Sequence, residues 1–600
     1  MATQPIHTFH IPVMGLAYTI DSPIRVAHYG ISSVISIIDD ELMEKMNAFY
    51  SEKFNLPYQE ISKKVKDHRA ERITSYCNLV DTIVKERFSR FKSELTESKV
   101  ALESYIATLP NTSSIKDGLI NLMGESHVLK ENIERFLEKH LKAGDIDVNI
   151  MTKVDKDNYS KSEQLPIEFN DAHASLRGFA NSNLNSSVVL SAGMNPRLYS
   201  YFENFKDFFP DNNNQLKKKI ILKVSDYRSA TIQGKFLAKK GLWISEYRIE
   251  SGLNCGGHAF ATEGYLLGPI LEEFKNKKAE LIQDTHDVYV KALHQKGLNV
   301  PEQPLDLKLS VQGGVGTAAE HQFLLENYQV DSVGWGTPFL LVPEATSVDE
   351  QTRTLLAKAN EKDLYLSNIS PLGIPFNTLK GTTNEYLKQQ RIDNNKAGSS
   401  CPKKYLALSK ELGPEGICTA SKKYQDVKLR ELEARKCELS KSTYENAKTK
   451  INEKACLCVG LANASLLKNN IKIKGQEQGV VICPGPNIAY FNKEVSLSNM
   501  MQHIYGNSSV LSPNYRPNMF VKELKMYMEY LRNEMETISE EVTAKQIKKW
   551  DTFKSNLLSG ISYYQDLFIA STAADGKTIQ KELLVYKEEL NAVQLTLENS

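Results

Sequence analysis

The segment Val311-Gln-Gly-Gly-Val-Gly-Thr-Ala-Ala-Glu320 has the pattern of a strand, a glycine turn and the start of a helix. An apolar-rich run from Leu307 ends at Gly313-Gly314, and Thr317 with Glu320 then forms a Thr-x-x-Glu capping box. Glycines let backbone N–H groups approach an anion closely, and a helix N-terminus adds a favourable dipole. The segment therefore predicts a phosphate-binding site.

A second glycine turn follows in Ser332-Val-Gly-Trp-Gly-Thr-Pro-Phe339. The apolar run that begins at Val330 stops here, and the turn supplies a second set of backbone donors beside the first. Two consecutive strand ends that both offer glycine amides match the phosphate site that the last two βα loops build in a TIM barrel. We therefore expect a phosphorylated cofactor at these two turns.

Further strand-like runs precede these turns, and amphipathic helices separate several of them. Strands that alternate with helices predict an α/β fold, and this many in a row favour a TIM (β/α)8 barrel. The runs are 10–15, 30–38, 147–153, 187–191, 219–224 and 241–250.

Two regions lack this alternation and predict additions to the barrel. Residues 41–144 are charged and helix-favouring, and sheet-like sequence resumes immediately after them, so they predict a large inserted helical subdomain with a structural or interface role. Beyond residue 345 the alternation fades. We expect a discontinuous barrel over 1–40 and 145–345, and a cysteine-containing, mostly helical C-terminal extension over 346–600.

The composition excludes several classes of protein. Lys plus Arg number 74 against 73 Asp plus Glu, which argues against a nucleic-acid or membrane-surface protein. No apolar run is long enough to cross a bilayer, and the N-terminal residues lack the pattern of a secretory signal. We therefore expect a cytoplasmic protein. In that reducing compartment its 8 cysteines should be thiols, ligands or small buried hydrophobes.

Most of the cysteines follow the predicted barrel. Cys401, Cys418, Cys456 and Cys458 could converge on a metal ion or iron–sulfur cluster, with Cys437 or Cys483 as substitutes. Their spacing is not a standard one and no His pair follows, so scattered buried thiols are favoured over a metal site. The turn Cys483-Pro-Gly-Pro-Asn487 predicts a structural corner.

A second motif, Ile249-Glu-Ser-Gly-Leu-Asn-Cys-Gly-Gly-His258, directly follows a predicted strand. The carboxyl ends of barrel strands carry the active site, so a glycine pair followed by His fits a flat ligand with a base beside it. Histidine suits that role because its pKa lies near neutrality. Alone, the motif would more often hold a structural His; the phosphate-binding turns strengthen the functional interpretation.

Taken together, these motifs resemble the nitronate monooxygenase family, formerly called 2-nitropropane dioxygenases. Cys255-Gly-Gly-His258, Gln312-Gly-Gly314 and Val333-Gly-Trp-Gly-Thr-Pro-Phe-Leu340 occur in the family's order. Pro12-Val-Met-Gly15 resembles its opening Pro-Met segment, and Asn149 its second-strand Asn. The resemblance covers about 9–40 and 145–345. It implies an FMN-dependent TIM barrel related to the flavin-dependent enoyl reductases of fatty-acid synthesis.

The resemblance also implies roles for individual residues. His258 would be the base that removes a proton α to a nitro group or assists substrate binding. Gly313, Gly314, Gly336 and Thr337 would hold the FMN phosphate, and Lys223 could contact the pyrimidine edge of the flavin. The residues expected against the isoalloxazine or ribityl are Met14, Gly15, Asn149, Gly256 and Gly257.

The sequence departs from the family at Asn254-Cys255, where Glu-Ala is usual, and in its two large additions. These departures bear on the identity of the substrate more than on the identity of the cofactor. The leading hypothesis is an oxidoreductase that acts on a small nitronate or similar carbon acid with O2 as acceptor. The alternatives are an NAD(P)H-dependent enoyl-thioester reductase and a non-catalytic barrel that serves assembly. The oligomeric state stays open, a homo-oligomer included.

Overall fold

A closed barrel of eight parallel strands forms the centre of the molecule in this computed structural model, which describes residues 5–124, 130–160, 163–191, 193–255, 263–473, 478–513, 515–536, 542–569 and 574–593. Around the barrel the strands run in the order β1-β10-β9-β8-β7-β6-β3-β2, so the chain closes between its first and last barrel strands. They are β1 (Phe9–Ile11), β2 (Ser32–Ser36), β3 (Ile146–Ile150), β6 (Ser187–Leu190), β7 (Lys219–Val224), β8 (Ile244–Glu250), β9 (Lys308–Gln312) and β10 (Ser332–Gly334). The predicted TIM barrel is confirmed.

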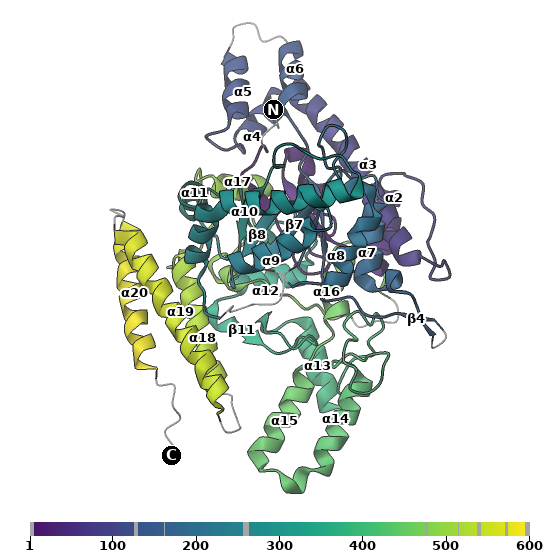
Figure 1. The fold of residues 1–600 in the computed structure, drawn as a ribbon, viewed down its shortest axis with the longest axis vertical. Coiled ribbons are helices and arrows are strands. Elements are labelled where there is room, and N and C mark those ends of the chain that lie inside the picture. The colour runs from purple at the N-terminus through teal and green to yellow at the C-terminus, as the bar shows by residue number, and fades with distance from the viewer. Residues whose placement is uncertain are drawn as a thin grey trace.

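Helices between the strands cover the outside of the barrel (Figure 1). Aliphatic residues at alternate strand positions, such as Val148, Val188 and Leu222, face these helices and are fully buried. These helices are α1 (Ser22–Val26), α7 (Asp171–Ala180), α8 (Pro196–Tyr201), α9 (Tyr227–Ala238), α10 (Leu267–Lys296) and α11 (Ala318–Asn327), and α12 (Glu350–Lys358) follows the last strand.

The inside of the barrel is largely polar. Val34, Val189 and Ile221 form a small inner cluster of their own. The strand registers place a set of polar residues on the same inner side. They are His10, Asp147, Asn149, Lys223, Glu246, Arg248, Glu250, Ser310 and Gln312. Several of these groups pair with one another; for example, Arg248 Nη2 lies 2.7 Å from Glu246 Oε1.

The region between β2 and β3 is helical, as the sequence predicts. Its helices are α2 (Asp40–Lys53), α3 (His68–Glu97), α4 (Lys99–Ile106), α5 (Ser114–Gly124) and α6 (Lys130–His140). The first two pack against each other, and α3 also packs on α7 of the barrel. Figure 1 shows α5 and α6 projecting away from the barrel as a separate tip, which has its own small core.

The chain after α12 returns to the barrel in two parts (Figure 1). The first holds a two-stranded hairpin of β11 (Leu364–Ser367) and β12 (Phe376–Leu379), helix α13 (Thr383–Asp393), a projecting pair of α14 (Lys422–Ala434) and α15 (Lys441–Glu453), the buried α16 (Leu457–Lys468), and α17 (Leu497–Ile504). The second is a bundle of α18 (Met519–Glu536), α19 (Ala544–Ile569) and α20 (Ala574–Ala592), which packs on α10.

None of the helices in the described ranges combines the length and apolar character needed to cross a bilayer.

Candidate functional site

The two glycine turns predicted as a phosphate site lie side by side. Strands β9 and β10 pair in parallel with Gln312 opposite Gly334, so Gly313-Gly314 and Gly336-Thr337 leave neighbouring strands at the same end of the barrel. Gly314 has φ +87°, and a Cβ there would lie 2.6 Å from Leu253 Cδ1. Within the described parts of the chain, the N–H groups of Gly314 and Gly336 have no hydrogen-bond acceptor. The turns therefore retain free donors for an anion.

A third turn, Pro484 to Asn487, packs against both glycine turns. Thr337 Oγ1 donates a 2.6 Å hydrogen bond to the Pro484 carbonyl, and Asn487 Nδ2 donates a 2.8 Å bond to the Val315 carbonyl. Gly485 has φ +73°, and a Cβ there would meet Thr337 Oγ1 at 3.0 Å. The predicted corner is thus part of the wall around the glycine turns, which no local sequence signal indicates.

Arg516, for which the sequence suggests no role, holds this arrangement together. Its guanidinium donates to the carbonyl of Gly314 at 2.6 Å, to Asn487 Oδ1 at 2.9 Å and to Glu320 Oε1 at 2.7 Å. The other oxygen of Glu320 accepts from the N–H of Gly316, so the helix start predicted at Thr317 is tied to the C-terminal region. Arg516 therefore links the first glycine turn, the Pro484 to Asn487 turn and helix α11.

Three of the residues expected against a flat ring, Met14, Gly15 and Asn149, belong to the described residues and follow or end strands of the barrel. Met14 is fully buried, and its sulfur would lie 3.6 Å from a Cβ on Gly336. Gly15 has φ +56° and is tightly packed on the ring of Tyr18. Asn149, near the end of β3, is 3 % exposed, and its Oδ1 has no partner among the described residues. A spare buried acceptor at this position is available to a ligand.

Lys223 also lies at the mouth of the barrel, close to Glu250 and Gln312, two residues to which the sequence motifs assign no role. Its Nζ is 2.7 Å from Glu250 Oε1, and Gln312 Nε2 donates to the same oxygen at 2.7 Å. Glu250 and Gln312 both lie at the carboxyl ends of their strands, and the register of β8 with β9 places them opposite each other. Their strand-end position is a signal that sequence reasoning could have used, because the mouth of a barrel carries its chemistry.

Gly256, Gly257 and His258 lie outside the described residues, so their predicted roles stay predictions. The preceding residue, Cys255, is buried, and its thiol donates to the Cys483 carbonyl at 3.5 Å. Burial raises the pKa of this thiol well above its usual value, and Cys483 adds to the effect. Cys255 is therefore a protonated packing residue and not a reactive thiolate.

Cys401, Cys418, Cys456 and Cys458, for which a cluster is the less favoured interpretation of the sequence, are all buried. Cys418 donates a hydrogen bond to Cys401, which lowers the pKa of Cys401, and burial raises the pKa of Cys458. The thiols of Cys401 and Cys418 contact each other, and the thiol of Cys458 is packed in the core. In the ranges that the structure describes, no three His, Cys, Asp or Glu side chains are arranged to hold a metal ion.

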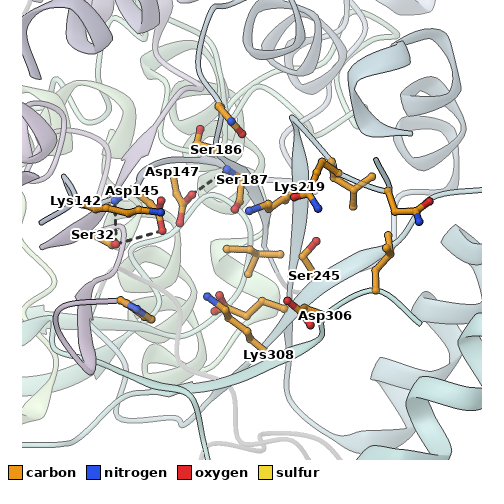
Figure 2. A pocket seen from close by; sticks show the side chains of 18 of the residues that line it. Ser32, Lys142, Asp145, Asp147, Ser186, Ser187, Lys219, Ser245, Asp306 and Lys308 are labelled. Atoms are coloured by element: carbon orange, nitrogen blue, oxygen red, sulfur yellow. Dashed lines mark hydrogen bonds between the residues drawn. The ribbon is translucent and has the colours of Figure 1, made fainter. Parts of the chain in front are cut away.

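A cavity of about 990 Å³ opens at the opposite end of the barrel. Figure 2 shows Lys219 pointing toward Asp147 across it, with Lys308 and Asp306 on a further side. Burial raises the pKa of Asp147, and the neighbouring carboxylates of Asp145 and Glu246 add to this. The amino ends of barrel strands commonly serve stability, so this cavity is not the candidate site.

Comparisons with known proteins add little beyond this geometry. No protein-family model and no curated protein matches the sequence. Among solved structures, the enoyl reductase domain of MlnA from the macrolactin biosynthesis cluster of Bacillus amyloliquefaciens shares 16 % identity, with 68 % of this chain and 90 % of that chain covered and a TM-score of 0.32. FabK from Thermotoga maritima shares 13 % identity, with 67 % and 83 % covered and a TM-score of 0.30. Likeness at this level says nothing of activity.

Proposed function

We propose that the protein is a flavin-dependent oxidoreductase that holds FMN at the carboxyl-end mouth of its barrel. The observation that carries the proposal is the placement of two glycine turns with free N–H groups beside a mouth lined by Asn149 and Lys223. The turns fit a phosphate dianion, because glycine amides can surround it without side chains in the way. The spare amide oxygen and the ammonium fit the polar edge of the flavin ring.

Different residues at the mouth would then bind the phosphate and the ring of the cofactor. Gly313, Gly314, Gly336 and Thr337 would bind the phosphate and so fix the position of the ring. Met14 and Gly15, with Gly256 and Gly257, would lie against the ring and exclude water from it. We propose FMN in particular because the two turns together would hold one phosphate group.

For the reaction itself, we propose oxidation of a small nitronate or similar carbon acid. Where the substrate enters as the neutral carbon acid, His258 would accept the proton from the carbon next to the electron-withdrawing group, since an imidazole takes up a proton near neutral pH. FMN, when bound, would supply the two-electron chemistry, with O2 as the electron acceptor. The protein's part is to orient the substrate carbon over the ring and to hold the abstracted proton on the imidazole.

The absorbance spectrum of the purified protein, before and after incubation with FMN, tests the cofactor. Flavin bands retained through gel filtration support the proposal, and a protein that binds no flavin contradicts it in favour of a non-catalytic barrel. Anaerobic bleaching of the flavin by a nitronate alone supports the oxidase chemistry. Rapid bleaching by NADH or NADPH would instead indicate an enoyl-thioester reductase.

The His258→Asn variant tests the base. It should keep bound FMN, because the phosphate turns are untouched, but lose most turnover; general-base removal typically costs about 10²–10⁴-fold. Unchanged turnover in a flavin-loaded His258→Asn protein would remove His258 from the mechanism without touching the cofactor assignment.

A further inference from the structure

One carboxylate oxygen at the mouth of the barrel accepts hydrogen bonds from three separate chain segments. Glu250 Oε1, at the end of β8, lies 2.7 Å from Lys223 Nζ on β7 and 2.7 Å from Gln312 Nε2 on β9. It also accepts a 2.6 Å bond from Asn254 Nδ2 in the loop that leads to the Gly-Gly-His motif. Glu250 thus fixes the orientation of three polar side chains at once.

We propose that Glu250 is a positioning residue of the flavin site: it orients Lys223 and Gln312 so that the mouth binds a cyclic imide edge, such as the pyrimidine edge of a flavin. This inference rests on the proposed function. It adds the group that organises the recognition, Glu250, to which the sequence motifs and the family resemblance assign no role.

The orientation of Gln312 follows from the charge of Glu250. A carboxylate accepts hydrogen bonds and cannot donate them, so the amide NH2 of Gln312 must face Glu250 and its carbonyl oxygen must face away. That oxygen, Oε1, is buried and has no partner among the described residues. Glu250 therefore turns Gln312 into an acceptor for a ligand N–H.

Lys223 is positioned by the same contact. Its side chain is 10 % exposed, and that of Glu250 is 15 % exposed, so the pair lies in a largely desolvated place. An ammonium carries three N–H groups, and Glu250 takes one of them. The remaining donors can bind ligand carbonyls. A spare acceptor on Gln312 beside donors on Lys223 complements the alternating C=O, N–H and C=O of an imide.

Glu250 itself is not placed to act as a general base. Its Oε1 already accepts three hydrogen bonds, so this oxygen is not free to approach a substrate proton. Glu250 therefore acts through Lys223 and Gln312. Its removal should change ligand recognition and the relative affinity for oxidised and reduced flavin.

The test compares Glu250→Gln with Glu246→Gln as a matched control. Glu246 is on the same strand and the same inner face but at the opposite end of the barrel, and its side chain is 14 % exposed. FMN affinity is measured by quenching of flavin fluorescence, and the midpoint potential of the bound flavin by dye-coupled titration. Neither readout depends on turnover.

With Glu250→Gln we expect oxidised FMN to bind about tenfold more weakly, because Gln312 is released from its orientation. The unneutralised Lys223 should favour the anionic reduced flavin over the oxidised form by about tenfold, which raises the potential by about 30 mV for a two-electron couple. Glu246→Gln should leave both values at those of the wild type. Wild-type affinity and potential in Glu250→Gln would overturn the inference.

A wild-type protein that binds no FMN would overturn the proposed function but would not decide the role of Glu250. The apoprotein then provides the readout: the rate at which an acid anhydride labels Lys223, measured by peptide mass spectrometry. We expect about tenfold faster labelling in Glu250→Gln than in the wild type or in Glu246→Gln. Equal rates in the three proteins would show that Glu250 does not hold Lys223.

Discussion

Arg516 and Glu320 form a buried ion pair, with 2.7 Å between Nη1 and Oε1, although 196 residues separate them in the sequence. Their side chains are 7 % and 5 % exposed. Glu320 is the acidic residue of the predicted capping box, and Arg516 also binds the carbonyl of Gly314. The C-terminal region is thereby joined to the turn that we propose to bind phosphate.

Removal of Arg516 should destabilise the protein and weaken FMN binding together. Arg516→Ala leaves Glu320 buried without its partner, which typically costs about 3–5 kcal/mol. The control is Arg435→Ala, whose pair with Glu438 is exposed and should contribute about 1 kcal/mol or less. Urea unfolding followed by circular dichroism measures both. Equal losses of stability in the two variants would contradict a structural role for the Arg516 pair.

Gly314→Asp should abolish FMN binding, because a side chain there meets Leu253 and brings a negative charge to the anion site. Gly297→Asp is the matched control: Gly297 also has a left-handed φ, +64°, but a Cβ on it meets nothing within 4 Å. It should cost about 1–2 kcal/mol of backbone strain and keep full flavin loading. A Gly314→Asp protein that retains its flavin would show that the anion site lies elsewhere.

Thr337 tests the contact between the second glycine turn and the Pro484 turn. Thr337→Val removes the hydroxyl that donates to the Pro484 carbonyl and should cost about 1 kcal/mol, with a further penalty for the buried carbonyl left unpaired. Thr337→Ser keeps the donor and should lose less in chemical unfolding. If serine is as destabilising as valine, the methyl group matters and the hydrogen bond does not.

Glu523 should make stability fall as the pH rises. This residue of α18 is buried and accepts from Ser251 Oγ at 2.7 Å and from the N–H of Leu267 at 2.8 Å, so it joins the two sides of the Gly-Gly-His loop. Burial raises its pKa from 4.5 to about 7. Because the folded state holds this proton more tightly than the unfolded state, ionisation weakens the fold between about pH 4.5 and pH 7.

The variant Glu523→Gln cannot ionise, and its stability should lack this part of the pH dependence. Between pH 5 and pH 8 the wild type should lose on the order of 3 kcal/mol relative to the variant. Thermal unfolding at several pH values measures the difference. Glu589→Gln, in an exposed pair with Arg532, is the control and should follow the wild type. Parallel curves for all three proteins would contradict the assignment.

Much of the fold was predictable because its signals are local. The run ending at Val311 and the glycine turn after it mark β9, and Thr317 caps α11 through the N–H of Glu320 as predicted. The interior of the barrel was not predictable. Asp147, Glu246 and Arg248 lie in short strands whose apolar neighbours dominate the pattern, and their inward side becomes evident only when the barrel closes.

The candidate site divides in the same way. Glycine positions and a His after a strand end are visible in the sequence, because turn geometry and close backbone approach require particular residue types. Glu250, Arg516 and the Pro484 turn carry no such mark. A glutamate at a strand end or an arginine before a proline is common, and its role depends on which side chains the fold brings within about 3 Å of it.

The sequence alone therefore determined the order of strands, turns and helix caps, since each depends on the conformational preferences of a few consecutive residues. The pairing of Arg516 with Glu320, and of Thr337 with Pro484, was decided by the tertiary structure alone. When folding excludes water, a charged or hydrogen-bonding group pairs with whichever polar group lies next to it. The packing of the C-terminal region on the closed barrel determines which group that is.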